Sequence, residues 1–201
     1  MTSAGRGPRE RMVFSAAQLI RRQGVGATGM RDVADHAGAP RGSLQHYFPG
    51  GKEQLVNEAV DWAGRYASER IGRFVSVMSR PSPSRLFNAM VQQWIDEFSA
   101  VGYETGCPLA AATVDCAASV ESTRAAVVGA FTAWRREIEK ALGDLGVPTR
   151  SRADVATLML TALEGAIVVA RAERDLHALQ TVARRLAPVL DGYVRQSHPR
   201  R

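Results

Sequence analysis

Apolar residues recur every three to four positions along most of the chain, and glycine or proline interrupts this spacing at intervals. In the first run, Val13, Ala16, Ala17 and Ile20 share such a spacing, and Gly24 ends it. Recurrence at this period places apolar side chains on one face of a helix, whereas strands need an alternation of two. No segment alternates in that way over a strand length. The pattern therefore predicts an all-α protein.

Two short helical runs joined by a tight, glycine-containing turn lie within the first fifty residues. The first run starts after Thr28, a residue type that favours the N-cap, and stops at Gly38. The second covers residues 41–47 and stops at Pro49-Gly50-Gly51. This spacing is typical of a helix-turn-helix, although other helical hairpins share it.

Longer helices are expected from Lys52 onward, over residues 52–78, 84–100, 109–116, 119–142, 150–172 and 176–195. The sequence thus predicts a three-helix helix-turn-helix domain over residues 1–51, with a basic arm at residues 1–9. A larger helical bundle over residues 52–201 follows it. The helix from Lys52 to Met78 would join the two domains.

Positive charge is concentrated at the N-terminal end of the chain. Residues 1–52 hold eight basic and three acidic residues, whereas the other 149 residues hold 18 and 17. A basic module beside a neutral one favours a polyanionic partner. A solubilising surface with a basic tail is the alternative reading of the charge alone.

Several function classes find no support in the sequence. It contains no phosphate loop, HExxH or CxxC motif, so neither an enzyme nor a metal or other cofactor is expected. Cys107 and Cys116 are too few for a disulfide framework and read as small apolar filler, with redox sensing as the alternative. No apolar run reaches the roughly 20 residues of a membrane helix, and a cytoplasmic location is expected. A helical scaffold protein is an alternative to a DNA-binding protein.

Residues 28–55, TGMRDVADHAGAPRGSLQHYFPGGKEQL, resemble the DNA-binding signature of the TetR repressor family. FPGGK at 48–52 and GCPLAA at 106–111 resemble its lincomycin-resistance repressor (LmrA-like) branch. The resemblance implies a ligand-responsive repressor with about nine helices, which a small molecule releases from double-stranded operator DNA. It also implies a homodimer formed by the last two helices. Two departures are Pro40, where relatives usually cap with Ser or Thr, and Gln45, where they commonly have an aromatic residue.

The candidate DNA-binding residues lie in and around the third helix. They are Thr28, Arg41, Gly42, Ser43, Gln45, His46, Tyr47 and Lys52. Arg41 suits guanine and Gln45 suits adenine, because each can form two hydrogen bonds to that base. The resemblance implies phosphate contacts for Thr28, Tyr47 and Lys52.

Each of these assignments has an alternative. Arg41 and Lys52 can be solvated surface charges. Tyr47 can be a buried partner of Phe48, and His46 can contact only backbone or water. Arg9 and Arg11 are further candidates for a phosphate or the minor groove.

The candidate ligand-binding residues are aromatic and apolar side chains of the larger domain, with one acid among them. They are Tyr66, Trp94, Phe98, Tyr103, Phe131, Trp134, Met159 and Glu164. Core packing is the alternative for each apolar residue. Glu164 sits in a helix that is apolar nearly all round, so its charge must be paired, solvated or neutralised. A ligand, Arg171 or a partner subunit could supply that pairing.

Two apolar stripes near the C-terminus suggest a dimer interface. One comprises Leu158, Ala162, Ala166 and Val169, and the other comprises Leu176, Leu179, Ala183, Leu186 and Leu190. Two such helices can pack against their copies across a two-fold axis. Packing within the subunit is the alternative for half of these residues.

Overall fold

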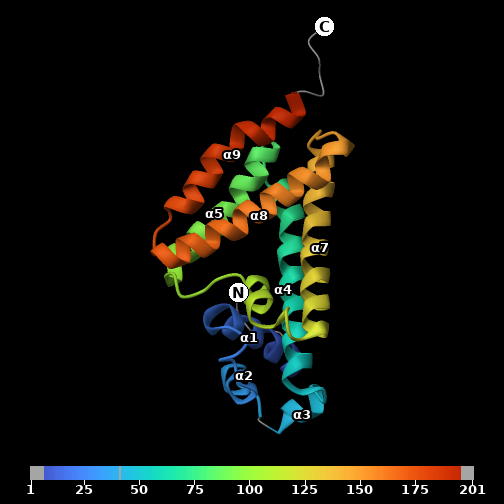
Figure 1. Cartoon of the computed structure of the whole chain (residues 1–201), viewed down its shortest axis with the longest axis vertical. Coiled ribbons are helices and arrows are strands. Elements are labelled where there is room, and N and C mark those ends of the chain that lie inside the picture. The colour runs from blue at the N-terminus through green and yellow to red at the C-terminus, as the bar shows by residue number, and fades with distance from the viewer. Residues whose placement is uncertain (1–6, 41, 196–201) are drawn as a thin grey trace. The chain divides into compact units, whose positions relative to one another are not determined.

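The computed structural model describes residues 7–40 and 42–195, and every regular element within them is a helix. In chain order the helices are α1 (Pro8–Gln23), α2 (Met30–His36), α3 (Ser43–Tyr47), α4 (Gly51–Ser76), α5 (Pro83–Val101), α6 (Pro108–Cys116), α7 (Glu121–Asp144), α8 (Thr149–Glu173) and α9 (His177–Arg195) (Figure 1). The all-α prediction is confirmed.

The first helix begins earlier than the sequence suggests. Residues 1–6 lie outside the described residues, but α1 already begins at Pro8, inside the segment expected to be an arm. Proline suits the first helical position because the amide hydrogen that it lacks has no partner there in any helix. The arm prediction is therefore wrong for Pro8 and Arg9.

Local sequence accounts for several helix ends. Gly24 caps α1 with a φ of 82°, and its N–H donates to Ile20 O at 2.9 Å, as its position predicts. At the start of α5, the Ser82 hydroxyl accepts the Arg85 N–H at 3.3 Å, and Pro83 takes the first helical position. These boundaries need no tertiary contact to explain them.

The chain divides into two compact units. The first takes the chain up to Arg65 together with Gly106–Phe131, and the second takes Tyr66–Thr105 and the chain from Thr132 onward. Residues 108–116 (α6) and the first half of α7 thus belong with the N-terminal helices. The division of DNA-binding and ligand-binding roles between residues 51 and 52 stays a prediction.

In the first unit, α1 packs against both α2 and α6. Met12, Ile20, Phe48 and Leu55 are almost fully buried in its core. In the second unit, α9 packs against α5 and α8 (Figure 1). One face of α5 carries six apolar residues at helical spacing, and all of them are buried: Leu86, Phe87, Met90, Val91, Trp94 and Phe98.

Helix α8 is long and apolar enough, by length and composition, to span a membrane. Part of its apolar surface nevertheless has partners within the second unit, because α8 packs against α5 and α9. Met159, Leu163 and Ile167 are each 1% exposed or less. A core helix of a bundle has this composition, so we interpret α8 as a packing helix.

Candidate functional site

Buried apolar side chains hold α2 and α3 together. Val33 and Ala34 of α2 are at most 1% exposed, Leu44 of α3 is 7% exposed, and Phe48 directly after α3 is fully buried. In contrast, Gln45 and His46 on the same short helix are exposed. The helix-turn-helix therefore keeps one side of α3 in the core and presents the other side to solvent.

Thr28 is not the N-cap of α2, and that prediction is wrong. The N-cap is Gly29, whose N–H donates to Asp32 Oδ2 at 3.2 Å. The Thr28 hydroxyl instead donates to Gly24 O at 2.7 Å, and the residue is 3% exposed. Because this bond closes the turn between α1 and α2, the Thr28 side chain is committed within the protein. Its role at a phosphate stays a prediction.

The start of α3 is held by the carbonyl of Pro40. The Ser43 N–H donates to Pro40 O at 3.0 Å and the Ser43 hydroxyl donates to the same oxygen at 2.5 Å. The helix begins at Ser43, two residues later than expected, and Arg41 lies outside the described residues. Gly42 is exposed, and a Cβ there would meet nothing within 4 Å, so a close approach by another molecule is unobstructed.

Two further candidates lie close in sequence to the exposed residues of α3: Tyr47 ends α3, and Lys52 follows near the start of α4. Tyr47 is half-buried, and its ring lies 5.1 Å from that of His46, centroid to centroid. Lys52, in the first turn of α4, donates from Nζ to Gly26 O at 3.2 Å. The ammonium of Lys52 therefore sits beside the turn that precedes α2.

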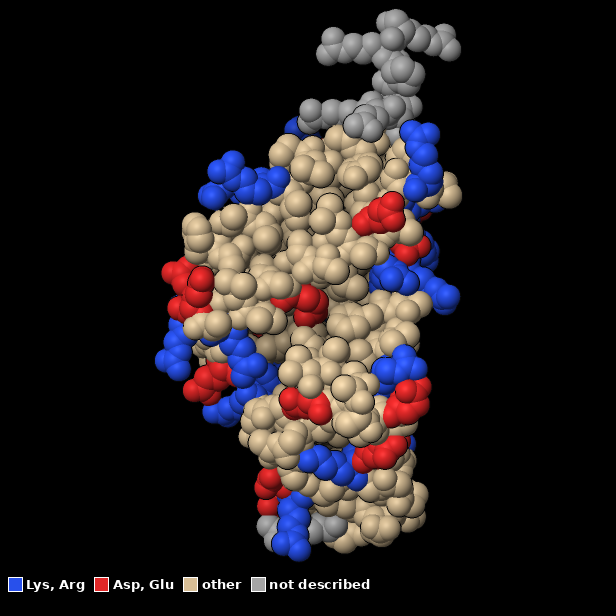
Figure 2. All heavy atoms as spheres, in the orientation of Figure 1, with Lys and Arg blue, Asp and Glu red and all other residues tan. Residues whose placement is uncertain are grey.

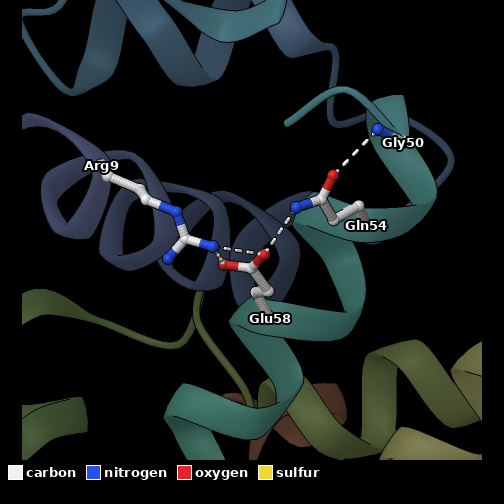
Figure 3. A network of polar contacts seen from close by, with 4 residues as sticks. All are labelled: Arg9, Gly50, Gln54 and Glu58. Atoms are coloured by element: carbon white, nitrogen blue, oxygen red, sulfur yellow. Dashed lines mark hydrogen bonds and ion pairs between the residues drawn. The ribbon is translucent and has the colours of Figure 1, made fainter. Parts of the chain in front are cut away.

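A polar network joins α1 to the start of α4 (Figure 3). Arg9 Nη2 lies 2.7 Å from both carboxylate oxygens of Glu58, Gln54 Nε2 donates to Glu58 Oε1 at 2.9 Å, and the Gly50 N–H donates to Gln54 Oε1 at 2.9 Å. The Arg9 guanidinium also lies 5.4 Å from the centre of the Phe48 ring. The network thus ties the turn between α3 and α4 to α1.

Sequence reasoning missed this network. It treated Arg9 and Arg11 as candidates for DNA contact, but Arg9 is bonded to Glu58, and Arg11 Nε donates to Ala37 O at 3.2 Å. The spacing of Gln54 and Glu58, four residues apart on one helix face, was the available signal. Nothing local indicates that Arg9, 49 residues away, is the partner of Glu58.

Seven of the eight candidate ligand-binding residues belong to the second unit, whereas Phe131 belongs to the first. Three of them form a continuous run of rings: Trp94 lies 5.9 Å from Phe98, and Phe98 lies 5.1 Å from Tyr103, between centroids. The Tyr66 hydroxyl accepts from Arg70 Nη1 at 2.5 Å. The rings are tilted by 50° and 37° to one another, and Trp94 and Phe98 are buried, so the run lies along the buried face of α5.

Trp134 and Glu164 place polar atoms inside the second unit. Trp134 is 6% exposed, and its Nε1 is buried with no hydrogen-bond partner among the described residues. Both carboxylate oxygens of Glu164 are buried, and Met159 is fully buried. A buried indole N–H without an acceptor costs folding free energy. Trp134 is therefore the strongest ligand-binding candidate of the set, because a ligand could supply the acceptor. The site assignment stays a prediction.

Two other chemistries are weakly supported. Burial and the neighbouring Asp115 carboxylate raise the pKa of the Cys116 thiol, although Lys52 opposes them. A raised pKa disfavours the reactive thiolate, which agrees with the interpretation of Cys116 as filler. Within residues 7–40 and 42–195, no three His, Cys, Asp or Glu side chains gather as metal ligands would.

Two families match the chain, one at each end. Residues 15–59 match the bacterial regulatory proteins of the tetR family, and residues 83–185 match the C-terminal domain of LmrA/YxaF-like transcriptional regulators. The first match covers the helix-turn-helix, and the second runs from α5 into the first half of α9.

Relatives of similar length are also transcriptional regulators. An HTH-type transcriptional regulator of Mycobacterium tuberculosis is 39% identical over 92% of this chain and 94% of its own. The HTH-type transcriptional regulator YxaF of Bacillus subtilis is 28% identical over 94% and 97%. A TetR transcriptional regulator from Legionella pneumophila has the same fold, with a TM-score of 0.79 at 18% identity over 93% and 99% of the two chains. The chain belongs to the TetR family of bacterial transcriptional regulators and carries an LmrA/YxaF-like C-terminal domain.

Proposed function

We propose that the protein is a repressor that binds operator DNA as a homodimer and leaves it when a small molecule binds the second unit. The exposed side of α3 carries the DNA-binding part of this proposal. Gly42, Gln45 and His46 are exposed there, while Leu44 and Phe48 anchor the opposite side in the core. A helix held in this way can enter the major groove and present side chains to base edges.

The residues around α3 suit a positioning role. Tyr47 is the last residue of α3 and Lys52 lies in the first turn of α4, and contacts from such residues to phosphates fix the register without reading the sequence. Arg41 adds a guanidinium that can form two hydrogen bonds to guanine. The curated relatives include a repressor, KstR2 of Mycolicibacterium smegmatis, which is 43% identical over 29% of this chain. Repression is therefore favoured over activation.

Dimerisation through α8 and α9 is supported by their exposed apolar residues. Val168, Val169 and Val189 are 57%, 42% and 47% exposed. Figure 2 shows a largely uncharged stretch of surface over these helices. A second copy would cover that stretch, and a dimer that binds an operator needs its two α3 helices about 34–36 Å apart, at successive major grooves. Leu179 and Leu190 are fully buried within the subunit and cannot contribute.

The proposed effector is an apolar, aromatic molecule with a hydrogen-bond acceptor. The rings of Trp94, Phe98 and Tyr103 would contact its flat surface, and Trp134 Nε1 would donate to its acceptor. A ligand that binds better to the DNA-free form shifts the population away from the operator.

DNA binding is tested by fluorescence anisotropy with labelled fragments from the region upstream of the protein's own gene. We expect sequence-specific binding that weakens with salt and that the double variant Arg41→Ala/Gln45→Ala loses. The matched control is Arg80→Ala/Gln92→Ala, which removes the same side-chain types from exposed positions of the second unit. The repressor assignment would be refuted by weak binding that is equal for all DNA sequences and unchanged in both double variants.

Effector binding is tested with 1-anilinonaphthalene-8-sulfonate, a fluorescent aromatic probe. We expect energy transfer from tryptophan to the bound probe and release of the DNA fragment as the probe is added. Trp134→Phe should weaken probe binding, whereas the partly exposed Trp62→Phe, in the first unit, should not. Equal loss in both variants would place the probe elsewhere.

A further inference from the structure

Arg70 lies on a face of α4 that is otherwise apolar and enclosed. Ala59 and Ala63 are 1% and 5% exposed, and Arg70 follows them at helical spacing on the same face. Arg70 is itself only partly exposed, and it belongs to the second compact unit. Arginine side chains are rarely enclosed unless they are paired. The guanidinium of Arg70 therefore needs partners that replace water.

Two aromatic rings of α4 flank this guanidinium. Its central carbon lies 5.3 Å from the centre of the Tyr66 ring and 5.2 Å from that of the Phe74 ring. Tyr66 and Phe74 lie four residues before and four residues after Arg70, so both rings reach it along one side of the helix. The Tyr66 hydroxyl also accepts a hydrogen bond from Arg70 Nη1 at 2.5 Å. Tyr66 thus holds the arginine in place.

The other edge of the guanidinium carries an unsatisfied donor. Arg70 Nε is buried, and it has no hydrogen-bond partner among the residues that the structure describes. Nε and Nη2 share this edge, and together they can donate two parallel hydrogen bonds to the oxygens of one carboxylate. An acceptor from another molecule would satisfy Nε.

The charge of Arg70 is also not balanced by an acid. Within residues 7–40 and 42–195, no Asp or Glu forms an ion pair with it. Glu69, the adjacent acid, lies instead 3.4 Å from Arg73, between Oε2 and Nη2, and these two side chains are 62% and 71% exposed. Removing a cation from water costs free energy unless an anion or hydrogen-bond acceptors compensate it. A bound anion would supply both the charge and the acceptor.

We propose that Arg70 forms an anion-binding subsite of the second unit and that the effector carries a carboxylate. This inference rests on the proposed function, which supplies the effector. The edge of Nε and Nη2 would bind the carboxylate, and the rings of Tyr66 and Phe74 would contact an aromatic body next to it. An uncharged molecule of the same shape should bind more weakly.

The subsite is tested in the full chain with two probes that share one ring system. They are 1-anilinonaphthalene-8-sulfonate, whose sulfonate stands in for the carboxylate, and the uncharged N-phenyl-1-naphthylamine. In fluorescence titrations, Arg70→Gln should weaken binding of the sulfonate probe about tenfold, because a charged pair of hydrogen bonds is lost. Binding of the uncharged probe should stay within about twofold of the wild type, because the aromatic contacts remain.

The matched control is Arg73→Gln, which removes the same charge from an exposed position of the same helix and should leave both probes bound as in the wild type. Equal loss of both probes in Arg70→Gln would mean that Arg70 only maintains the fold of the unit, and would overturn the subsite. Unchanged binding of the sulfonate probe, or the same loss in Arg73→Gln, would overturn it as well.

A second measurement needs no variant. With the wild-type protein, 1-naphthoate should displace the sulfonate probe at about tenfold lower concentration than 1-naphthamide, which keeps the rings and an acceptor but has no charge. Displacement by both at the same concentration, or by neither, would overturn the subsite.

Failure of the proposed function would be recognised separately, by adding each probe to the complex with operator DNA. Binding of the sulfonate probe that depends on Arg70 but releases no DNA would refute release by an effector and leave the subsite standing. Release of DNA by both probes at equal concentration would support the proposed function and overturn the subsite. A wild-type protein that binds neither probe would overturn both.

Discussion

At the scale of single residues, α3 separates the side chains that hold the helix from those that can read DNA. Leu44 is buried, whereas Gln45 and His46 directly after it are exposed. Neighbouring positions on a helix point in directions about 100° apart, so a five-residue helix can do both. Substitutions at the buried positions of α3 should therefore affect folding, whereas substitutions at its exposed positions should affect DNA binding.

Gln45→Ala should weaken binding to the preferred operator and reduce discrimination at one base pair, by about 1–3 kcal/mol, because a two-bond contact to adenine is lost. Anisotropy titrations with the operator and with single-base variants of it measure both effects. The thermal midpoint should stay unchanged, since Gln45 is exposed. An equal loss of affinity for every DNA sequence would assign Gln45 to the phosphates instead.

Asp61 on α4 makes stability depend on pH. Asp61 is exposed at the surface, but partial desolvation of its carboxyl is the main cause that raises its pKa above the ordinary value of 3.8; Arg65 opposes this shift and Glu58 adds to it. The folded protein thus holds this proton more tightly than the unfolded chain. The resulting stabilisation is complete below the unfolded pKa and is lost as pH rises through the raised pKa.

Asp61→Asn should therefore raise the thermal midpoint at pH 7 and leave it close to that of the wild type at pH 3, where the carboxyl is protonated in both states. Calorimetry at the two pH values measures this difference. Asp144→Asn, at the exposed end of α7, is the control for the loss of one negative charge. A lower midpoint for Asp61→Asn at pH 7 would mean that attraction to Arg65 dominates.

At the scale of elements, the network of Arg9, Glu58, Gln54 and Gly50 fixes how the chain passes from α3 into α4 (Figure 3). Because Arg9 is bonded to Glu58, we expect its charge to position the turn between α3 and α4. A positioning role and a phosphate role differ in how they respond to salt.

Glu58→Gln should lower the free energy of unfolding by about 0.5–1 kcal/mol, because the Arg9 side chain is half exposed and the ion pair is partly screened. Operator affinity should fall, but the slope of its dependence on salt should stay unchanged, since no phosphate contact is lost. Chemical denaturation and anisotropy measure these effects. Glu69→Gln, which breaks the exposed pair with Arg73 on the same helix, is the control. A changed salt slope would contradict the positioning role.

At the scale of the whole molecule, the proposed repressor needs two copies of the chain. Val168 of α8 and Val189 of α9 are exposed on helices that pack against each other. The double variant Val168→Glu/Val189→Glu should give a monomer in sedimentation velocity experiments, because burying the new charges in an interface is unfavourable. Operator affinity should fall with it.

Val77→Glu is the matched control, since Val77 is 82% exposed just after α4 and should leave the dimer intact. A double variant that remains dimeric with unchanged operator affinity would place the interface elsewhere. Dissociation in both variants would indicate a general loss of solubility.

Helix content and several helix ends follow from the sequence alone. The apolar period predicts the buried face of α5, Gly24 predicts the end of α1, and the run over residues 28–55 indicates the family. These signals are local, because backbone geometry and neighbouring side chains suffice to produce them. The position of Thr28 shows their limit, since a nearby Asp32 carboxylate makes Gly29 the N-cap.

Contacts between distant residues were decided by the tertiary structure. The sequence contains no sign that Asp115 bonds Val25 across 90 positions, that Gly106 bonds Arg21, or that Arg9 bonds Glu58. Such bonds join a side chain to whichever partner the packing of the helices brings near. The number of residues between the two partners follows no repeat that could be recognised in the sequence. The sequence by itself determined which helices form and to which family they belong. Packing decided that α6 belongs with the N-terminal helices and which residues position them.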